Sequence, residues 1–282
     1  QLKHDNPLSS VMNGQFTYLS SVITAISDLK KAGLVPNEVQ QLIEQNQQFI
    51  DEITPAVREV FANRINAKTI TLAGELLSKA IDTCTDFQQL PFSNEPTLAQ
   101  IFTDSLSSAL NDAELSGKTT PLTNWKKNWV TTDDNKEIIL SDSVKNNKLS
   151  AVNEVYAEYL KQMIEQSLYD YDDMILRVVH ALELFPSLKF DLQEQYQYIL
   201  VDEFQDTNDA QMRILRNLTD YDSSPNIMIV GDDDQAIFRF QGADISNIQS
   251  FAASYNEVKT VVLSENYRSH RTVIDTAESV EP

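Results

Sequence analysis

Three short apolar runs in the second half of the chain, each ending in polar residues, constrain its fold more than any other feature. They read "YQYILVDE" at 196–203, "NIMIVGDDDQ" at 226–235 and "VKTVVLSENYRS" at 258–269. The first two are apolar at consecutive positions, which is typical of strands buried on both faces of a parallel sheet. A helical pattern with Asn208 as its N-cap lies between them. With the third run as a further strand, this alternation of strands and helices predicts an α/β fold that binds its ligand at the carboxyl ends of the strands.

Helical periodicity dominates the first half of the chain. The stretch 16–31 carries apolar residues at helical spacing, and a second apolar stripe begins after Pro36. Thr54 and Pro55 have the pattern of another helix start, because proline is favoured in the first helical turn. The stretch 111–150 is polar and is expected to be rich in loops.

A long helix is expected from Leu149 onward, with the tyrosines of "NEVYAEYL" on its core face. After this helix, helical periodicity gives way to the short apolar runs described above. We therefore expect two units, an all-α accessory subdomain at 1–149 and an α/β unit at 150–282.

Composition restricts the environment and the partners. The formal net charge is −20, so the surface as a whole does not attract nucleic acid, whose phosphates are usually met by lysine and arginine. The single cysteine, Cys84, cannot form a disulfide within the chain, which favours a reducing compartment. We expect a cytoplasmic protein without a membrane span. The chain begins at Gln1 rather than methionine, so we expect a piece of a longer protein.

Asp202 and Glu203 are the first candidate site residues, because they end a buried strand. Two adjacent carboxylates there suit a magnesium-bound nucleoside triphosphate, with one for the metal and one for the attacking water. Taken alone, such a pair indicates the start of a solvated loop more often than a functional site. The segments that follow it decide the interpretation.

"VDEFQDTN", "VGDDDQAIFRFQGA" and "LSENYRS" occur in this order and resemble motifs II, III and IV of the UvrD/Rep/PcrA-type superfamily 1 DNA helicases. "YDYDDMIL" resembles the element just upstream of motif II in that family. The resemblance covers about residues 150–277. It implies part of a RecA-like P-loop NTPase motor domain with a parallel sheet, and it assigns the helical first half to an inserted accessory subdomain.

The resemblance also implies roles for individual residues, with ATP and Mg²⁺ as cofactors. Asp202 would hold Mg²⁺ through water, and Glu203 would orient and deprotonate the water that attacks the γ-phosphate. Gln235 would sense the γ-phosphate and Arg268 would place a planar cation on it. Tyr267 would stack on the adenine.

Motif III implies a contact with single-stranded DNA. Phe240 lies where the family places an aromatic ring against a base, and Phe238 replaces the usual tyrosine of "QSIY". Packing in the core is the alternative for both rings. Gln241 stands where the family has arginine, which removes a positive charge close to the expected DNA strand.

Two acidic clusters are expected to have structural roles. Three consecutive residues cannot all point at one ion, so the run Asp232, Asp233 and Asp234 is expected to cap turns. Tyr169, Asp170, Asp172 and Asp173 of "YDYDDMIL" are expected to pack and to cap a helix start rather than to touch substrate. The three histidines are dispersed, and no zinc site is expected.

A phosphate loop of the form G-x-x-x-x-G-K-[S/T] is missing. "LSGKTTP" offers Gly117, Lys118 and Thr119, but Asp112 occupies the first glycine position and the preceding pattern is helical. We expect the phosphate loop, and motifs V and VI, in sequence outside this chain. The 282 residues alone are expected to be inactive.

The function expected of the whole protein is that of an ATP-dependent DNA helicase or translocase moving 3′ to 5′ on single strands. Its partners are expected to be DNA, ATP and other repair or recombination proteins. Two alternatives stay open: the helicase subunit of an AddA- or RecB-like helicase–nuclease, and a non-catalytic nucleotide-sensing or interaction module. A metal phosphohydrolase built on "GDDDQ" is a weaker alternative, because it gives no role to Gln235 or Arg268.

Overall fold

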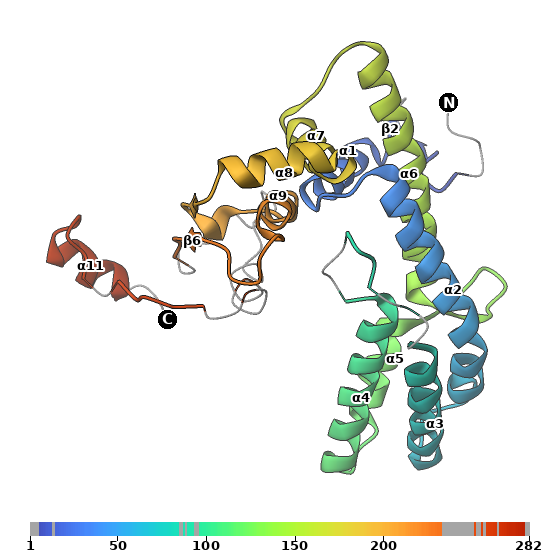
Figure 1. Cartoon of the computed structure of the whole chain (residues 1–282). Helices are drawn as coiled ribbons and strands as arrows, with labels where there is room; N and C mark the ends of the chain where they lie inside the picture. Colours follow the sequence, from blue (N-terminus) through green and yellow to red (C-terminus); the bar gives the residue numbers. More distant parts are fainter. Residues whose placement is uncertain are drawn as a thin grey trace.

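The structure, a computed structural model, describes residues 6–12, 15–84, 87, 89–92, 96–232, 251, 255, 258–263 and 265–279. Most of the described chain is helical, and two bodies can be distinguished (Figure 1). We call them the helical bundle and the sheet body. Two long helices, α2 (Pro36–Phe61) and α6 (Ser141–Glu165), run from one body to the other.

The helical bundle contains α3 (Ala67–Cys84), α4 (Leu98–Ser116), α5 (Thr120–Trp129) and the second half of α2. A short antiparallel hairpin, β3 (Val130–Thr132) and β4 (Ile138–Leu140), closes it. Its core is aromatic, and edge-on or stacked ring contacts link Phe49, Phe61, Phe102 and Trp125. Burial of these large rings supplies a hydrophobic core separate from that of the sheet body.

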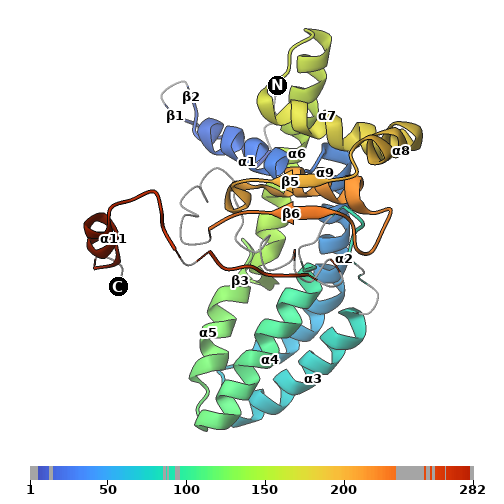
Figure 2. The ribbon, with the colours of Figure 1, turned by 60° about the vertical axis from the view of Figure 1, so that its left-hand side comes forward.

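The sheet body contains α1 (Leu19–Lys31), α7 (Tyr171–Leu184), α8 (Pro186–Gln195) and α9 (Asp209–Thr219). Its strands β5 (Ile199–Val201) and β6 (Ile227–Ile229) pair in parallel, with Leu200 opposite Met228. Figure 2 shows the pair with the helices around it. The chain also forms a hairpin of β1 (Val11–Met12) and β2 (Gln15–Phe16) near its start, and α11 (Arg271–Glu278) near its end.

The third expected strand differs from the prediction. Residues 258–263 form no strand in the described part of the chain, and Val262 and Leu263 are 81% and 83% exposed. An apolar run forms a stable strand only when a neighbouring strand takes its backbone hydrogen bonds, and none of the described strands does so. Two parallel strands agree with an α/β fold, but they do not by themselves establish a RecA-like sheet.

Two predictions about the first half were wrong. Thr54 and Pro55 do not start a helix, because α2 continues through them from Pro36 to Phe61. Proline removes one backbone donor there, and the apolar face of α2 on either side, with Ile53 and Val57 fully buried, keeps the helix intact. The stretch 111–150 is not mainly loop, since it holds the end of α4, α5, the β3–β4 hairpin and the start of α6.

The predicted boundary at 149/150 falls inside α6, and α1 packs against α6 through a small core and also contacts α7. Tyr156 of that core is fully buried and donates a hydrogen bond to the carbonyl of Leu34, as its expected core position requires. Helix α1 therefore lies with the sheet body, although it precedes the helical bundle in sequence.

Two asparagines fix α6 against α2. Asn146 Nδ2 donates to the Ile43 carbonyl at 3.0 Å, and Asn153 Nδ2 donates to the Pro36 carbonyl, also at 3.0 Å. The two donors and the two acceptors are each seven residues apart, in opposite chain directions, so the helices are antiparallel with one axial register. No described helix is both long and apolar enough to cross a membrane.

Candidate active site

The carboxylate pair lies where β5 ends. The Val201 carbonyl accepts a hydrogen bond from the Val230 N–H (2.8 Å), and the Val230 carbonyl accepts one from the Phe204 N–H (2.9 Å). These bonds hold the chain on both sides of Asp202 and Glu203 against the end of β6. Both carboxylates are exposed, so a ligand can reach them.

Glu203 has an unusual backbone conformation. Its φ is +49°, in the left-handed region that few residues other than glycine adopt. Its N–H donates to Asp202 Oδ1 at 3.0 Å, and its carbonyl accepts from the Asp206 N–H. The turn directs the chain from β5 into the short 3₁₀ helix η1 (Phe204–Asp206). Such conformations are held only where the surroundings determine them, and they cluster at functional sites.

Gln205 connects the carboxylate pair to the end of the neighbouring strand. Its Nε2 donates to Glu203 Oε2 at 2.6 Å, and its Oε1 accepts from the Asp232 N–H at 3.0 Å. The side chain is only 2% exposed. The sequence analysis did not single out this residue, because nothing in the pattern except its place two residues after Glu203 distinguishes it.

Gly231 makes this approach possible. A Cβ added there would lie 2.8 Å from Gln205 Oε1 and 3.3 Å from Phe204 Cβ, and both of these side chains are buried. A larger residue would therefore push the backbone of 231–232 away from Gln205. The requirement is for space and not for a special backbone angle.

The floor of the site is apolar and rigid. Phe204 is 1% exposed and makes an edge-on contact with Phe251, with ring centroids 5.5 Å apart. Met212 of α9 completes this cluster. Asn208 caps α9 through the Gln211 N–H, and Gln211 returns the bond to the Asn208 N–H, which confirms the predicted N-cap.

Asp202 fits the requirements of magnesium. Within the described ranges no group of three or more His, Cys, Asp or Glu side chains is arranged to hold a metal ion. Mg²⁺, however, keeps several waters and is usually bound by one or two carboxylates together with substrate phosphates. The exposed Asp202 carboxylate lies at the end of a parallel strand, and one of its oxygens accepts from the Glu203 N–H, so it is a suitable ligand of this kind.

The comparisons with known proteins decide the family. Residues 37–256 match the UvrD/REP helicase N-terminal domain. The chain belongs to this family.

Its relatives are bacterial helicases. It is 38% identical over 129 residues to the ATP-dependent DNA helicase PcrA of Bacillus subtilis, and 40% identical over 126 residues to PcrA of Staphylococcus aureus. It is 38% identical over 135 residues to the ATP-dependent DNA helicase UvrD1 of Mycobacterium bovis. These matches cover 45–46% of this chain but only 17–18% of each relative, so the matched stretch spans less than a fifth of their length.

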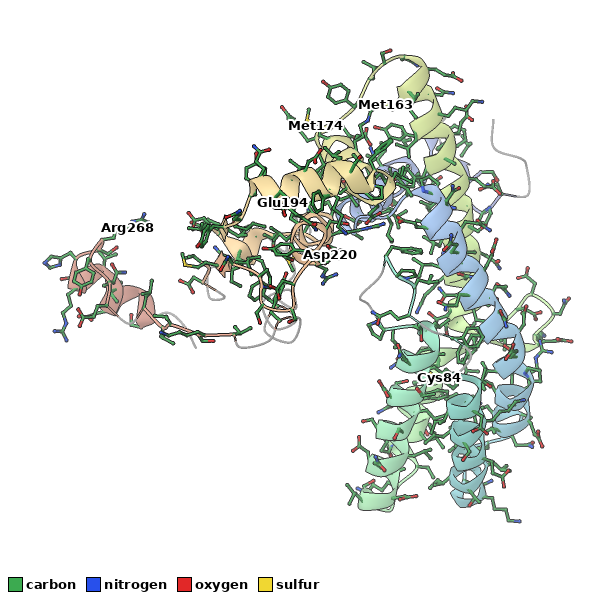
Figure 3. The ribbon with its side chains drawn as sticks, in the orientation of Figure 1. Cys84, Met163, Met174, Glu194, Asp220 and Arg268 are labelled. Atoms are coloured by element: carbon green, nitrogen blue, oxygen red, sulfur yellow. The ribbon has the colours of Figure 1, made fainter. Side chains whose placement is uncertain are left out.

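The structure does not bring the UvrD/REP motif IV residues to the carboxylate pair. Tyr267 is 89% exposed and Arg268 is also exposed, and both lie just before α11. Figures 1 and 2 show α11 apart from the β5–β6 pair in both views, and Figure 3 shows Arg268 beside α11. The described part of motif IV is therefore separate from Asp202 and Glu203 in this structure.

The motif III candidates Gln235, Phe238, Phe240 and Gln241 lie outside the described residues, as do Asp233 and Asp234. Their assignments stay predictions. Asp232 is described, and its N–H is the donor to Gln205. That contact is made by the backbone, so the structural role expected of the Asp232 side chain stays a prediction.

The acidic element upstream of motif II caps a helix, as predicted. Asp170 accepts from the Asp173 N–H at the start of α7, and Asp173 accepts from the Asp170 N–H. The sequence analysis missed their cation, Lys30, whose Nζ lies 2.7 Å from both carboxylates and which is 1% exposed. Tyr159 donates to Asp170 as well, and the Lys30 ammonium lies over its ring. The cluster fastens α1 to α7.

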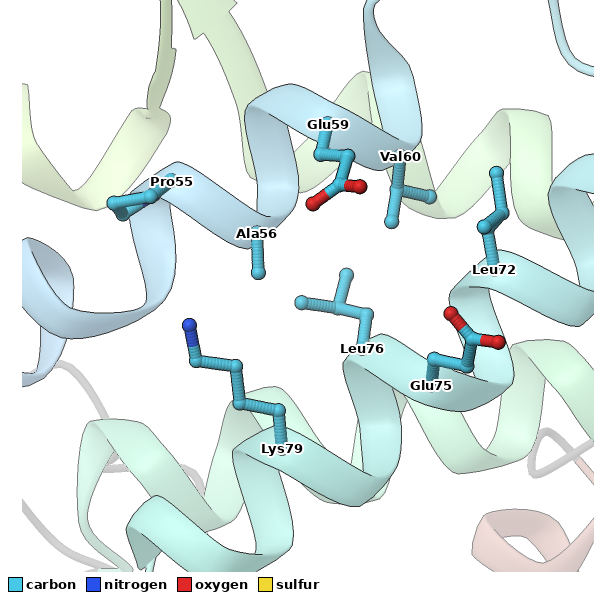
Figure 4. Close-up of a pocket in the computed structure, with 8 residues that line it drawn as sticks. All are labelled: Pro55, Ala56, Glu59, Val60, Leu72, Glu75, Leu76 and Lys79. Carbon is cyan, nitrogen blue, oxygen red and sulfur yellow. The ribbon is translucent and has the colours of Figure 1, made fainter.

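The segment that imitates a phosphate loop is a helix end. Gly117 follows α4 with φ +63°, and its N–H donates to the Glu114 carbonyl, so Lys118 and Thr119 simply connect α4 to α5. A separate hollow of about 240 Å³ lies in the helical bundle between α2 and α3 (Figure 4). Glu59, Glu75 and Lys79 surround an apolar floor of Ala56 and Leu76 there, away from the carboxylate pair.

Proposed function

We propose that this chain is part of the motor of an ATP-dependent DNA helicase or translocase, and that Asp202 and Glu203 belong to its ATP hydrolysis site. One observation carries the proposal: β5 and β6 are parallel, and the ends of both meet at the carboxylate pair, which lies within the stretch matched by the UvrD/REP family. In α/β folds ligands bind at this edge of the sheet.

The proposed chemistry is hydrolysis of the terminal phosphoanhydride bond. The oxygen of a water attacks the γ-phosphorus while the bond to the β–γ bridging oxygen breaks, so that ADP and inorganic phosphate are formed. Glu203 orients this water and takes its proton. Asp202 would hold Mg²⁺ through water, and the ion would supply positive charge that neutralises the phosphates.

Further residues complete the proposed site. Arg268 and Gln235 contact the γ-phosphate, and Tyr267 stacks on the adenine. Since Arg268 lies apart from Glu203 in this structure, the proposal requires the segment around α11 to come closer when nucleotide binds. The sequence has no G-x-x-x-x-G-K-[S/T] motif, so the cradle for the phosphates has to come from outside these residues.

The proposed track is single-stranded DNA, with movement 3′ to 5′. In this proposal Phe240 stacks on a base, and Phe238 and Gln241 lie beside the strand. Stacking does not depend on base sequence, so it suits a translocating motor. The net charge of −20 is compatible with this proposal, since a local groove can hold the strand without a basic surface. The helical bundle is the proposed accessory subdomain.

The test uses the longer protein that contains this sequence, compared with its Glu203→Gln variant. Loss of an activating base commonly lowers kcat by about 10²–10⁴-fold. We expect a loss of this size with nucleotide and single-stranded DNA binding retained. Wild-type protein that binds neither magnesium-ATP nor single-stranded DNA would contradict the proposal and favour a non-catalytic module. Helicase-like ATPase activity of residues 1–282 alone, abolished by Glu203→Gln, would contradict the external phosphate cradle.

A further inference from the structure

We propose that Gln205 is a positioning residue that holds the Glu203 carboxylate in one orientation and links it to the backbone of Asp232. The bonding pattern is a property of the chain itself, whereas its consequence for hydrolysis rests on the function proposed above. The inference adds a named residue to the site and a physical connection between its two strand ends.

The two hydrogen bonds fix the orientation of the Gln205 amide. The Glu203 carboxylate can only accept, so the Nε2 group of Gln205 has to face it (2.6 Å). The Asp232 N–H can only donate, so Oε1 has to face that side (3.0 Å). The opposite orientation of the amide would break both bonds. Glutamine is the natural amino acid of this length that supplies one donor and one acceptor, and neither glutamate nor methionine can replace it.

Burial makes the arrangement stiff. Gln205 is 2% exposed, while Glu203 itself is exposed and has three rotatable side-chain bonds. Unsupported, an exposed glutamate samples many rotamers, and a base that must meet one water loses rate when it does. A buried amide that donates to one carboxylate oxygen restricts this motion and leaves the other oxygen for the water.

The second hydrogen bond, from the Asp232 N–H, connects Gln205 to the segment that follows β6. Asp232 immediately precedes the stretch 233–241, which contains Gln235 and the proposed DNA-contacting residues. Gly231 leaves the space that this bond requires, since a Cβ there would meet Gln205 Oε1 at 2.8 Å. A shift of the backbone at 232 therefore acts on Gln205, and through it on the Glu203 carboxylate.

The first experiment tests the bond in the chain itself, without nucleotide. In the ¹⁵N-labelled 282-residue chain, the side-chain amide signal that disappears in Gln205→Met is that of Gln205. We expect it to be shifted from free glutamine and slow to exchange, and to move towards the free position in Glu203→Ala. A Gln205 signal at the free position, or one that Glu203→Ala leaves unchanged, overturns the proposal.

The second experiment measures ATP hydrolysis in the longer protein. Gln205→Glu keeps the acceptor for Asp232 but places a like charge beside Glu203, and Gln205→Met removes both bonds at similar length. Both variants lose the hydrogen bond to the charged Glu203, so we expect kcat to fall by a factor on the order of ten to a hundred in each. We expect the KM for ATP to stay within about twofold, because Gln205 does not touch the substrate.

A double variant and a structural control complete the design. Gln205→Met should lower kcat no further in a Glu203→Gln background, because the group it positions is already gone. Gln211→Met, which breaks the cap of α9, should lower thermal stability but not kcat. Unchanged kcat in the Gln205 variants, or an equal further loss in the double variant, overturns the positioning role. A wild-type protein without ATPase activity would refute the proposed function, while the amide signal still decides the bond.

Discussion

Arg213 on α9 and Glu38 at the start of α2 are 175 positions apart in sequence, yet their side chains form an ion pair with a separation of 2.6 Å. The same guanidinium makes two bonds to the Glu183 carboxylate on α7 and one to the Gly33 carbonyl. Burial lowers the pKa of Arg213, but the Glu183 and Glu38 carboxylates outweigh burial and raise this pKa above its ordinary value. One side chain therefore joins α9 and α7 of the sheet body to the start of the long helix α2.

Removing this cation should strongly destabilise the protein. Arg213→Met leaves Glu38 and Glu183 without their partner, and breaking a largely buried pair from one side costs about 3 kcal/mol. Urea denaturation followed by circular dichroism measures the change. Arg216→Met on the same helix is the matched control, since Arg216 forms no ion pair with the described carboxylates. Equal losses in both variants would contradict the role given to Arg213.

Acid should weaken the protein through Glu183 and Asp170. Burial favours the neutral form of both, but Arg213 outweighs it for Glu183 and Lys30 for Asp170, so both pKa values lie below the ordinary 4.5 and 3.8. The folded state therefore binds fewer protons than the unfolded state near these values. This contribution is complete above about pH 5 and is lost as pH falls through the folded-state pKa values. Urea midpoints measured from neutral pH downward should decrease, and less steeply in Arg213→Met.

Base should weaken the protein through Lys30. Burial lowers the pKa of its ammonium, but Asp170 and Asp173 outweigh this and raise it above 10.5. Its contribution is complete below 10.5 and is lost as pH rises through the folded-state pKa. Lys30→Met should cost about 3 kcal/mol at neutral pH. Lys31→Met is the control, since Lys31 makes no ion pair with a described carboxylate. Chemical unfolding at neutral and alkaline pH compares the two variants. An equal loss of stability in Lys30→Met and Lys31→Met would refute this assignment.

We expect Asn146 and Asn153, between α2 and α6, to lower the stability of the protein but to hold the two helices in one register. Each has a buried Oδ1 for which the described chain offers no hydrogen-bond partner. Replacing both Asn146 and Asn153 with leucine should raise the free energy of unfolding by about 1 kcal/mol, because an apolar interface no longer buries these atoms. The helices should then sample more than one register, visible as broadened amide signals along α6. Asn147→Leu on the exposed side of α6 should change neither property.

Two glycine-to-alanine substitutions should have opposite effects. Gly74 lies within α3 with nothing within 4 Å of an added Cβ, so Gly74→Ala should stabilise the protein by about 0.5–1 kcal/mol through helix propensity. Gly231→Ala forces a Cβ against Gln205 and should lower the stability of the protein by about 1–3 kcal/mol. Thermal unfolding compares the two. Gly231→Ala should also release the Gln205 amide signal; an unperturbed signal would contradict the close packing.

Local chemistry was predictable from the sequence. The caps at Asp170 and Asn208, the first two strands and the helical nature of the segment before Gly117 all follow from residues within one or two turns of each other. The family resemblance was equally local, and the match over 37–256, which contains motifs II and III, confirms the family.

Contacts between distant segments were not predictable. Lys30 and Arg213 gave no signal, because a lysine or arginine on a helix is ordinarily solvated and its partners here are 140 to 180 positions away or on other helices. The helix through Pro55 survives because buried residues on both sides hold it, which outweighs the local preference. The strand expected at 258–263 depends on a neighbour, and the apolar pattern alone cannot supply one.

The polypeptide passes between the helical bundle and the sheet body twice, and each time as continuous helix, 26 residues in α2 and 25 in α6. A flexible tether would let the bundle drift independently of the strands. Here any reorientation must bend or twist hydrogen-bonded rods that are clamped together at two asparagines. In the motor proposed above, a movement of the strand ends would therefore be transmitted to the helical bundle through α2 and α6.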